Sequence, residues 1–481
     1  LWSQSPVAFF APARDHRTME TISFGTDGWR ATLEEFTTPR VRMVGQAVAT
    51  YLDDEGLEGP VAIGYDARET SRGFAEELSR VLCANGFDVL LSDRDRPTPL
   101  VAHAIVDRDL AGALVITASH NPPEYNGVKF IPDDGAPALP AVTDAIADRL
   151  AEPESLPEAD HGTVREVDFA PSHADAVFDL VESITGSADL SGLSVAYDAM
   201  HGSGRGTTDA VLERAGADLE RVRCERDPDF GGGSPEPAAE NLETLIETVT
   251  DDSGVDLGIA NDGDADRIAV VTPERGYLDE NLFFAALYDY LLEDASGSAV
   301  RTVSTTYLID RIAEAHGEPV REVPVGFKWV AEAMADGDAL VGGEESGGFT
   351  VRGHVREKDG VLMALLAATM HADEPLDERV DRLLETHGTV VQDKISVDCP
   401  DSEKARVLDD LETAIPETVA DTDVEDVNTA DGFKLLLADG SWLLVRPSGT
   451  EPVLRVYAEA GDEKRVRELL EAGRGLLEPL V

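Results

Sequence analysis

Residues 60–93 read PVAIGYDARETSRGFAEELSRVLCANGFDVLLSD, and this segment contains two kinds of hydrophobic pattern. The apolar run at 60–65 predicts a strand, and the amphipathic pattern over about 71–85 predicts a helix that ends near a glycine. A second apolar run at 87–92 predicts another strand. A strand, a helix and a strand in this order predict parallel strands joined by a crossover helix.

The same pattern occurs twice more along the chain. Residues 193–224 predict a strand at 193–198, a helix at 204–215 and a strand at 219–224. Residues 301–326 predict a strand at 301–305, a helix at 307–316 and a strand at 319–324. The units share a pattern and not their residues, so we expect three similar α/β domains with mixed, largely parallel sheets.

The C-terminal segment has a different pattern. A strand and an acidic helix are followed by the hairpin-like KLLLADGSWLLVRPSG at 434–449, the strand LRVYAEA and a last helix from about 462. Asp-Gly at 439–440, between two apolar runs, is a strong turn signal. This part therefore predicts a smaller α+β domain.

Acidic stretches that contain proline, at 151–163, 272–277 and 371–379, indicate linkers. The expected domains are 19–155, 156–274, 275–384 and 385–481. Residues 1–18 lack the basic and long apolar regions of a signal peptide, and the patterned sequence starts after Met19. We expect residues 1–18 to be a disordered extension.

Acidic residues dominate the whole chain and are not gathered in one tail. There are 95 acidic and 40 basic residues, the formal net charge is −55, and the isoelectric point is about 4.3. Such a composition resembles that of haloarchaeal proteins, in which high salt screens the self-repulsion. It argues against nucleic acid and anionic membranes as partners. The three cysteines form no CxxC pair, which favours reduced thiols in the cytoplasm.

The segment NDGDADR, residues 261–267, follows the apolar run VDLGIA. In extended backbone, Asp262, Asp264 and Asp266 would point to one side, where their charges repel unless a cation bridges them. Oxygen ligands favour Mg²⁺ or Ca²⁺. An EF-hand is excluded because Arg267 and Pro273 stand where that loop needs glycine and glutamate. A solvated acidic turn remains the alternative.

Four other loops contain residues suited to a phosphate or a sugar. In RPSGTEP at 446–452, hydroxyls, amides and a guanidinium can surround a phosphate, although a plain hairpin loop is the alternative. GGEESGG at 342–348 can accept and donate hydrogen bonds to hydroxyls. VGFK at 325–328 has one of only seven lysines at a predicted turn, and FGTDGWR at 24–30 ends in an arginine. The candidate residues are Arg446, Ser448, Gly449, Thr450, Arg455, Glu344, Ser346, Lys328 and Arg30.

Ser119, in ITASHNP, follows the buried run GALVI and so lies at a strand end, where α/β sheets bind ligands. Thr117 and Asn121 stand where a nucleophile elbow needs glycines. In extended backbone the side chains of Ser119 and His120 would point to opposite faces, which makes His120 a poor base for Ser119. A turn without catalytic function is the alternative.

The motifs FGTDGWR, TASHNP, DGDADR, GEESG and RPSGTEP, in this order, resemble those of the α-D-phosphohexomutase family. The resemblance covers the chain beyond residue 18. It implies a heart-shaped protein of four domains, three of them similar α/β domains, around a central cleft to which each domain contributes one loop.

The resemblance also implies the role of each motif. Ser119 would be the phosphoserine, and one Mg²⁺ per chain would be bound by Asp262, Asp264, Asp266 and a phosphoserine oxygen. Glu344 and Ser346 would bind sugar hydroxyls. The residues around the transferred phosphoryl group would be Arg30, Lys129, Arg267 and Lys328, and those that hold the second phosphate Arg446, Ser448, Gly449 and Thr450, with Arg455 as a further contact. Lys129, His120 and Lys328 remain alternative bases.

The expected activity is the interconversion of hexose 1-phosphate and hexose 6-phosphate through a 1,6-bisphosphate, with glucose 1,6-bisphosphate as activator. Gly348 stands where members that act on both mannose and glucose phosphates often have histidine, which favours glucose. Phosphomannomutase and phosphoglucosamine mutase are alternatives. A Mg²⁺-dependent phosphatase, a bisphosphate synthase or a non-catalytic sugar-phosphate-binding protein is more remote. The resemblance is compatible with a monomer or a homodimer.

Overall fold

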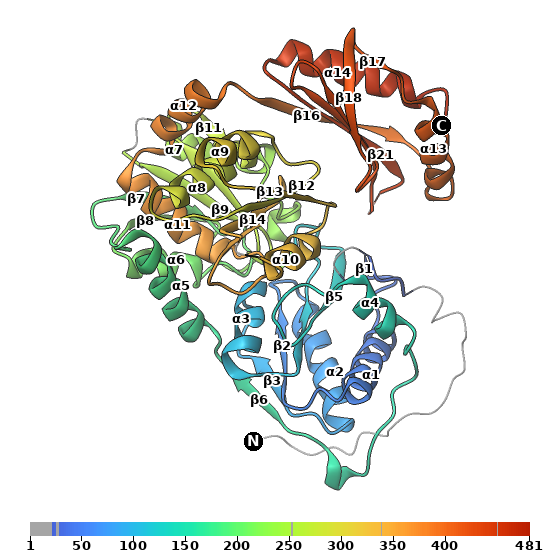
Figure 1. Ribbon diagram of the computed structural model, residues 1–481. Helices are drawn as coiled ribbons and strands as arrows, with labels where there is room; N and C mark the ends of the chain where they lie inside the picture. Colours follow the sequence, from blue (N-terminus) through green and yellow to red (C-terminus); the bar gives the residue numbers. More distant parts are fainter. Residues whose placement is uncertain (1–21, 26–27, 252–253, 338, 450) are drawn as a thin grey trace.

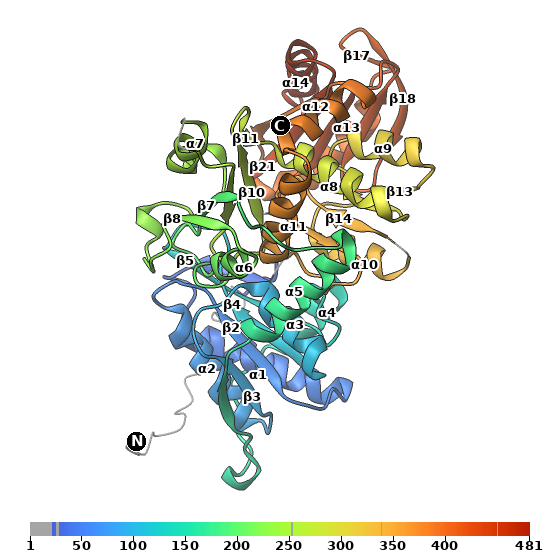
Figure 2. The same ribbon diagram turned by 90° about the vertical axis from the view of Figure 1, so that its left-hand side faces the viewer.

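The computed structural model describes residues 22–25, 28–251, 254–337, 339–449 and 451–481. Four sheets follow one another along the chain, and each forms the centre of one structural unit (Figure 1). The first unit lies at one end of the molecule, and the second and third lie together above it (Figure 2). Residues 1–18, for which a disordered extension is expected, lie outside the described residues.

The first sheet has helices on both faces. Its strands, in spatial order, are β1 (Trp29–Thr32), β5 (Tyr125–Ile131), β4 (Gly112–Ile116), β2 (Val61–Tyr65), β3 (Val89–Ser92) and β6 (Val164–Val167). Its helices are α1 (Thr38–Glu55), α2 (Ser71–Ala84), α3 (Thr98–Arg108) and α4 (Pro140–Ala147). The neighbouring strands β4, β2, β3 and β6 are parallel to one another, whereas β5 pairs antiparallel with β4 and β1.

Alternate residues of β2 enter two different cores, as the period of a strand requires. Ile63 packs in the core that contains α1 and α2, whereas Ala62 packs in the core that contains α3. The strand, helix and strand predicted from residues 60–93 are confirmed. Because β6 pairs with β3, this sheet continues beyond residue 155, where we expected the first domain to end.

The second sheet has the order β11 (Gly276–Leu278), β10 (Ile268–Thr272), β9 (Leu257–Asn261), β7 (Ser194–Asp198) and β8 (Asp218–Val222), with helices α5 (Ala170–Thr185), α6 (Thr208–Arg214) and α7 (Glu243–Thr250). Helix α6 begins four residues later than predicted. Residues 201–207 form turns instead, in which Gly206 has a φ of 68°. The side chain of Arg205 is fixed there by a buried ion pair with Asp95 of the first unit.

The third sheet has the order β13 (Val320–Val323), β12 (Ala299–Thr302), β14 (Val341–Gly343) and β15 (Phe349–Val351), with helices α8 (Glu280–Asp294), α9 (Leu308–His316), α10 (Phe327–Ala335), α11 (Gly360–Asp373) and α12 (Leu376–His387). Helix α11 is apolar and buried on nearly all sides. It packs against β9 and β10 of the second unit as well as β15 of its own. The second and third units therefore share one hydrophobic core.

The fourth sheet is antiparallel throughout, and two helices pack against it. Its order is β16 (Val391–Asp398), β21 (Val453–Ala460), β20 (Trp442–Pro447), β19 (Phe433–Leu437), β18 (Thr422–Asn428) and β17 (Thr418–Val419), with helices α13 (Asp401–Ala414) and α14 (Glu463–Leu477). The predicted hairpin is formed by β19 and β20, and Gly440 in its turn has a φ of 79°. The fold class, three α/β domains with mixed sheets and a C-terminal α+β domain, is confirmed.

Among the buried polar contacts between the units are two clusters that involve the third unit. At the first, His173 of α5 and His354 each form a hydrogen bond with Asp359 Oδ2, at 2.6 and 2.7 Å. Asp359 Oδ1 also accepts two backbone N–H groups and so caps α11. At the second, the buried Lys434 ammonium lies between the rings of Tyr307 and Trp442 and pairs with Glu322 at 2.7 Å.

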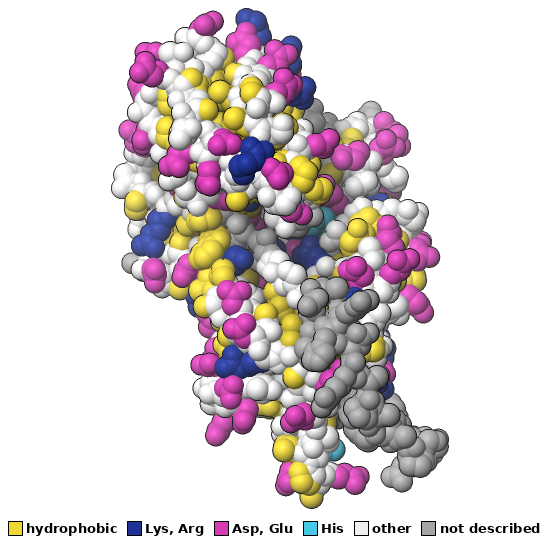
Figure 3. Space-filling model, turned by 90° about the vertical axis from the view of Figure 1, so that its right-hand side faces the viewer, with side chains coloured by type: hydrophobic (Ala, Val, Ile, Leu, Met, Phe, Trp, Pro, Cys, Tyr) yellow, Lys and Arg dark blue, Asp and Glu magenta, His cyan; other side chains and the backbone are white. Residues whose placement is uncertain are grey.

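Acidic side chains are spread over the upper and lower parts of the molecular surface, and a hollow that contains several basic side chains crosses the middle of one face (Figure 3). Within the described residues, no helix combines the length and the apolar character that a membrane span requires. Cys83, Cys224 and Cys399 are free thiols.

Candidate active site

The predicted loops follow the ends of central strands. Ser119 comes after β4, Asp262 directly follows β9, Glu344 directly follows β14, and Ser448 directly follows β20. Strand ends gather ligand-binding loops because backbone groups there leave the ladder and side chains converge above the sheet edge. The predicted site loops therefore come one from each of the four units.

Ser119 is 1% exposed and has a φ of 51°, a left-handed conformation that is unusual for a residue with a side chain. Its hydroxyl donates to Asp262 Oδ2 at 2.7 Å. Its amide donates to the Thr117 hydroxyl at 2.8 Å. The structure thus brings the predicted phosphoserine into contact with the predicted metal site.

The expectation that His120 points away from Ser119 is wrong. His120 Nδ1 lies 3.2 Å from Ser119 Oγ, because the left-handed turn at Ser119 replaces the extended backbone that the expectation assumed. Burial, followed by the charges of Arg267 and Arg30, lowers the pKa of His120 well below its usual value. The His120 carbonyl accepts a hydrogen bond from Ser234 of the second unit.

Asp262, Asp264 and Asp266 are buried, and one oxygen from each lies within 4.8 Å of the others. They converge through a turn rather than through extended backbone. Ala265 has a φ of 52°, and the Asp266 amide donates to Asp262 Oδ1 at 3.1 Å. Burial, together with the charges of Asp264 and Asp266, raises the pKa of Asp262 well above its usual value.

The donor set of this triad fits a hard divalent cation, since all its side-chain ligands are carboxylate oxygens. Asp264 Oδ1 and Asp266 Oδ1 are buried and have no hydrogen-bond partner. A buried carboxylate oxygen without a donor is costly, and a cation between the three side chains would satisfy it. Burial disfavours the charged form of Asp264, but Lys129 and the Thr98 hydrogen bond outweigh it and lower its pKa.

Three cations surround the triad. Lys129 Nζ lies 3.4 Å from Asp264 and 3.1 Å from Asp266. Lys358 Nζ, from the third unit, lies 3.3 Å from Asp266. The Arg267 amide donates to Asp262 at 3.2 Å, and its guanidinium lies 3.9 Å from Asp266. These charges offset the negative charge of the buried carboxylates.

Arg30 lies on β1 at the edge of this group. Its guanidinium donates to the Asn121 side chain at 3.2 Å, and its charge lowers the pKa of Asp264. It therefore lies within electrostatic range of the triad, on the side of the Ser119 loop.

The loop after β14 carries Glu344 and Ser346. Glu344 is 8% exposed and accepts the Gly326 amide at 2.8 Å, so the turn that precedes Lys328 lies beside it. Burial, followed by the charge of Glu345, raises the pKa of Glu344 to about 7. Ser346 is half-buried in the turn. Lys328 Nζ lies 5.8 Å from the centre of the Trp329 ring.

The loop after β20 forms a separate group at the fourth unit. Arg446 pairs with Asp431 at 2.8 Å, and Asp431 also accepts the Val325 amide of the third unit at 3.2 Å. Arg455 pairs with Glu451 at 2.6 Å. Gly449 is exposed, Ser448 is 4% exposed, and Thr450 lies outside the described residues. The structure places the two arginines at the loop but paired with carboxylates.

Sequence reasoning missed four residues that hold these loops. Lys358 is not among the predicted residues. The scarcity of lysine in this chain was the signal that could have identified it. Thr98 donates to Asp264 Oδ2 at 2.7 Å. Lys404 donates to the Ser448 and Glu451 carbonyls at 2.7 and 2.6 Å. Arg68 contacts the Ser119 loop. The tripeptide Tyr-Asp-Ala precedes Arg68 at the end of β2, and the same tripeptide occurs at the end of β7.

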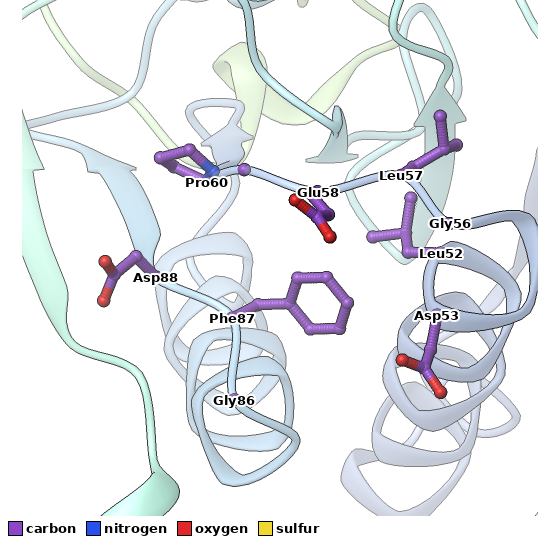
Figure 4. A pocket seen from close by; sticks show the side chains of 10 residues that line it. Leu52, Asp53, Gly56, Leu57, Glu58, Pro60, Gly86, Phe87 and Asp88 are labelled. Carbon is purple, nitrogen blue, oxygen red and sulfur yellow. The ribbon is translucent and has the colours of Figure 1, made fainter.

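A surface pocket of about 410 Å³ lies in the first unit, away from the residues described above. It is lined by residues of the α1 end and of the loops that precede β2 and β3, among them Leu57, Glu58 and Phe87 (Figure 4). Since β2 and β3 run parallel to β4, this pocket opens at the sheet edge opposite Ser119. It is not part of the site.

Family models match nearly the whole chain. Phosphoglucomutase/phosphomannomutase domain I matches residues 21–156, domain II 172–276, domain III 279–387 and the C-terminal domain 395–474. The chain belongs to the phosphoglucomutase/phosphomannomutase family. Members of this family are mutases, so the protein is an enzyme of this class.

Similar proteins differ in their assigned substrates. The chain is 32% identical over 463 residues to a phosphoglucomutase/phosphomannomutase of Thermococcus kodakarensis, covering 95% of this chain and 98% of that protein. It is 35% identical over 470 residues to a phosphopentomutase of the same organism, with 93% and 96% covered. A crystal structure of a protein from Thermus thermophilus, assigned to the phosphomannomutases, has a TM-score of 0.82 at 31% identity and covers 95% and 99% of the two chains.

Proposed function

We propose that this mutase interconverts hexose 1-phosphate and hexose 6-phosphate, with glucose as the preferred sugar, and that Ser119 carries the phosphoryl group between turnovers. The observation that supports this most directly is the 2.7 Å hydrogen bond between Ser119 Oγ and Asp262 Oδ2. A phosphoryl group on that oxygen would lie against the carboxylate triad and the three cations around it.

Asp262, Asp264, Asp266 and an oxygen of the phosphorylated Ser119 would hold one Mg²⁺. Bound there, the ion would neutralise charge on the phosphoryl oxygens during transfer. Lys129, Lys358 and Arg267 add positive charge on the protein side. Phosphoryl transfer depends mainly on alignment and charge stabilisation, so these buried, fixed cations supply what the reaction needs.

The reaction has two transfers. A hydroxyl oxygen of the hexose monophosphate forms a bond to the phosphorus of phosphoserine, the bond from phosphorus to Ser119 Oγ breaks, and the hydroxyl proton passes to a base. The resulting 1,6-bisphosphate turns over in the cleft. Ser119 Oγ then forms a bond to the other phosphorus, the bond from that phosphorus to the sugar oxygen breaks, and the sugar oxygen takes up a proton to become the free hydroxyl. In-line transfer puts the sugar hydroxyl on the far side of the phosphorus from Ser119 Oγ. His120, whose Nδ1 lies 3.2 Å from Ser119 Oγ, would exchange a proton with the serine oxygen, and Lys129 or Lys328 would accept the proton of the sugar hydroxyl.

The remaining loops would hold the sugar in either orientation. Glu344 and Ser346 would bind hydroxyls, and Arg446, Ser448, Gly449 and Thr450 would bind the phosphate that is not transferred, with Arg455 nearby. In the described structure, Arg446 is paired with Asp431. A substrate phosphate would therefore compete with that carboxylate for the guanidinium.

The preferred sugar is the finer part of the proposal. Gly348 supports glucose, whereas relatives are assigned as phosphopentomutase and as "Probable phosphoglucosamine mutase", the latter from Methanothermobacter thermautotrophicus and 33% identical over 462 residues. Competition among glucose, mannose, glucosamine and ribose 1-phosphates in molar KCl with Mg²⁺ and a trace of glucose 1,6-bisphosphate tests it. We expect the highest kcat/KM for glucose 1-phosphate.

The same assay tests the reaction. Conversion to the 6-phosphate without release of inorganic phosphate supports the mutase. Phosphate release at the rate of turnover would indicate a phosphatase, and net accumulation of bisphosphate would indicate a synthase. Full activity in Ser119→Ala would refute the assignment of the phosphoryl carrier.

A further inference from the structure

Arg68 is a buried arginine that contacts the Ser119 loop but lies outside the predicted catalytic motifs. Its side chain starts just after β2 and is 2% exposed. All five guanidinium N–H groups have acceptors, which is the full donor capacity of arginine. Nε donates to Asp66 Oδ2 at 3.0 Å. The other four bonds go to main-chain carbonyls of Ser119 (3.0 Å), Asn121 (2.6 Å), Pro122 (2.6 Å) and Tyr125 (3.1 Å).

These four carbonyls span the loop between β4 and β5. Nη2 binds the Ser119 and Asn121 carbonyls, and Nη1 binds those of Pro122 and Tyr125. A planar fork with fixed donor directions determines where all four carbonyls point. A lysine has three rotatable donors on one atom and cannot reproduce this pattern. One side chain thus binds four carbonyls of this loop.

The guanidinium itself contacts two further side chains, Asp66 and Phe230. Asp66 pairs with Nε, and its other oxygen accepts the Ser71 hydroxyl at 2.6 Å and the Arg68 amide at 3.1 Å. The Ser71 hydroxyl in turn accepts a hydrogen bond from the Asn126 side chain at 3.0 Å. The Phe230 ring of the second unit lies 5.0 Å from the guanidinium carbon.

The contact with the Ser119 carbonyl has a direct effect on the reacting oxygen. Ser119 has a left-handed backbone, a conformation that persists only where its surroundings impose it. Fixing its carbonyl fixes the peptide plane after it, and with it the direction of the Ser119 side chain toward Asp262. The carbonyl has little room to move on its other side, because a Cβ at Gly263 would lie 2.6 Å from it.

We propose that Arg68 is a positioning residue for phosphoryl transfer: it holds the Ser119 loop so that Oγ faces the carboxylate triad. This inference rests on the proposed role of Ser119. Arg68 acts through the main chain and does not contact the sugar site. Its loss therefore slows phosphoryl transfer and leaves the binding of the hexose phosphate nearly unchanged.

The experiment compares Arg68→Lys and Arg68→Ala with Arg379→Lys. Arg379 is a matched control because it is also 2% exposed and paired with carboxylates, but it lies on α12 and bonds to Asp289, Glu293 and Glu374. For each variant we would measure thermal unfolding, kcat and KM for glucose 1-phosphate, and the rate at which phosphoenzyme loses its phosphoryl group to added hexose phosphate, followed by intact mass.

We expect kcat of Arg68→Lys to fall about 100-fold, with KM changed less than about threefold, because a misplacement of about 1 Å costs that much in transfer. Arg68→Ala should be slower still. The phosphoenzyme should transfer its group more slowly by the same factor as kcat. Arg379→Lys should lower the unfolding temperature and keep kcat. Equal kcat in Arg68→Lys and Arg379→Lys would overturn the inference.

If the Arg68 variants do not fold, the variant Asp66→Asn provides the test. It preserves the shape of the Asp66 side chain and one acceptor oxygen but removes the negative charge that orients Arg68 Nε. A lower kcat at unchanged KM supports the inference, and a wild-type transfer rate overturns it. Ser119→Ala distinguishes a failure of the proposed phosphoryl carrier from a failure of the proposed role of Arg68. Full activity there refutes the proposed carrier, whereas an inactive Ser119→Ala beside a fully active Asp66→Asn refutes only the role of Arg68.

Discussion

The hydroxyl of Ser119 donates a 2.7 Å hydrogen bond to Asp262 Oδ2, although the two residues are 143 positions apart in the chain. This contact joins the loop after β4 of the first unit to the loop after β9 of the second. It places a serine hydroxyl against three buried carboxylates, two of which have an oxygen without a hydrogen-bond donor.

Replacement of Asp262 by asparagine tests the metal site. The variant keeps one oxygen near Ser119 but removes a charged ligand, so we expect the Mg²⁺ concentration for half-maximal activity to rise about 100-fold. The measurement is turnover as a function of Mg²⁺ after treatment with a chelator. Asp289→Asn, in a carboxylate that pairs with Arg379 away from the site, should leave the Mg²⁺ dependence unchanged. An unaltered dependence in Asp262→Asn would exclude this metal site.

Replacement of Lys129 by methionine should destabilise the metal-free protein. The ammonium pairs with Asp264 and Asp266, and removing one partner of a buried ion group costs about 3 kcal/mol in the free energy of unfolding. Mg²⁺ should restore more stability to this variant than to the wild type, because the cation replaces the lost charge. Chemical denaturation with and without Mg²⁺ measures both effects.

Lys464→Met is the control for that experiment. Lys464 is 80% exposed in its side chain and pairs with Glu468 on the surface of α14, so its loss should cost less than about 0.5 kcal/mol. If both lysine variants unfold at the same denaturant concentration without Mg²⁺, the electrostatic account of the triad is wrong.

Gly348 provides the space through which Lys358 reaches the triad. A Cβ at position 348 would lie 2.3 Å from Lys358 Cδ, so Gly348→Ala should displace this side chain from Asp266. We expect kcat to fall about tenfold, comparable to the loss of one charged contact to a buried group. Gly475→Ala, where a Cβ meets open space, should be neutral.

The double variant Gly348→Ala/Lys358→Met distinguishes this mechanism from a general loss of packing. If glycine acts by admitting Lys358, the double variant should be no slower than Lys358→Met alone, because coupled residues are non-additive. Steady-state kinetics of the four proteins give the coupling. Simple multiplication of the two single effects would contradict the explanation.

Glu344 should give the activity a pH-dependent component near neutrality. Burial and the charge of Glu345 raise its pKa to about 7, so its carboxylate, the better acceptor for sugar hydroxyls, forms as pH rises through that value. We expect kcat/KM to rise across this range and Glu344→Gln to flatten that rise. The second ionisation of the substrate phosphate, near about 6, is common to both proteins and cancels in their ratio.

The same group affects stability with a definite sign. The pKa of Glu344 is higher in the folded than in the unfolded protein, so its contribution to stability is complete below the unfolded value and disappears as pH rises through about 7. Denaturation measured from pH 5 to 8 should show a decline that Glu344→Gln lacks. Parallel curves for the two proteins would contradict the shifted pKa.

Lys404 should affect binding of the second phosphate. Its ammonium holds the Ser448 and Glu451 carbonyls on the inside of the loop after β20. Lys404→Met should loosen that loop and raise KM for the hexose phosphate about tenfold, while kcat changes less, since this loop binds the part of the substrate that does not react. A lower kcat at unchanged KM would place Lys404 in the chemical step instead.

Local sequence was sufficient to predict the α/β units, because hydrophobic periodicity records which face of each element is buried. It was also sufficient to predict most of the loops, since glycines, carboxylates and hydroxyls at strand ends are visible within a few residues. Prediction failed where backbone conformation depended on distant contacts. The left-handed backbone at Ser119 and Ala265 and the late start of α6 at Thr208 are examples.

The sequence by itself determined the three repeated units, the fourth antiparallel unit, the order of the polar loops and the carboxylate triad. Tertiary structure alone decided that His120 faces Ser119, that Lys358 crosses Gly348 to reach Asp266, and that Arg68 holds the Ser119 loop. The physical reason is that the two kinds of interaction act over different separations along the chain. Periodicity and turn chemistry act between neighbours in the chain, whereas these contacts form only when separate units pack and bury charges that must then find partners.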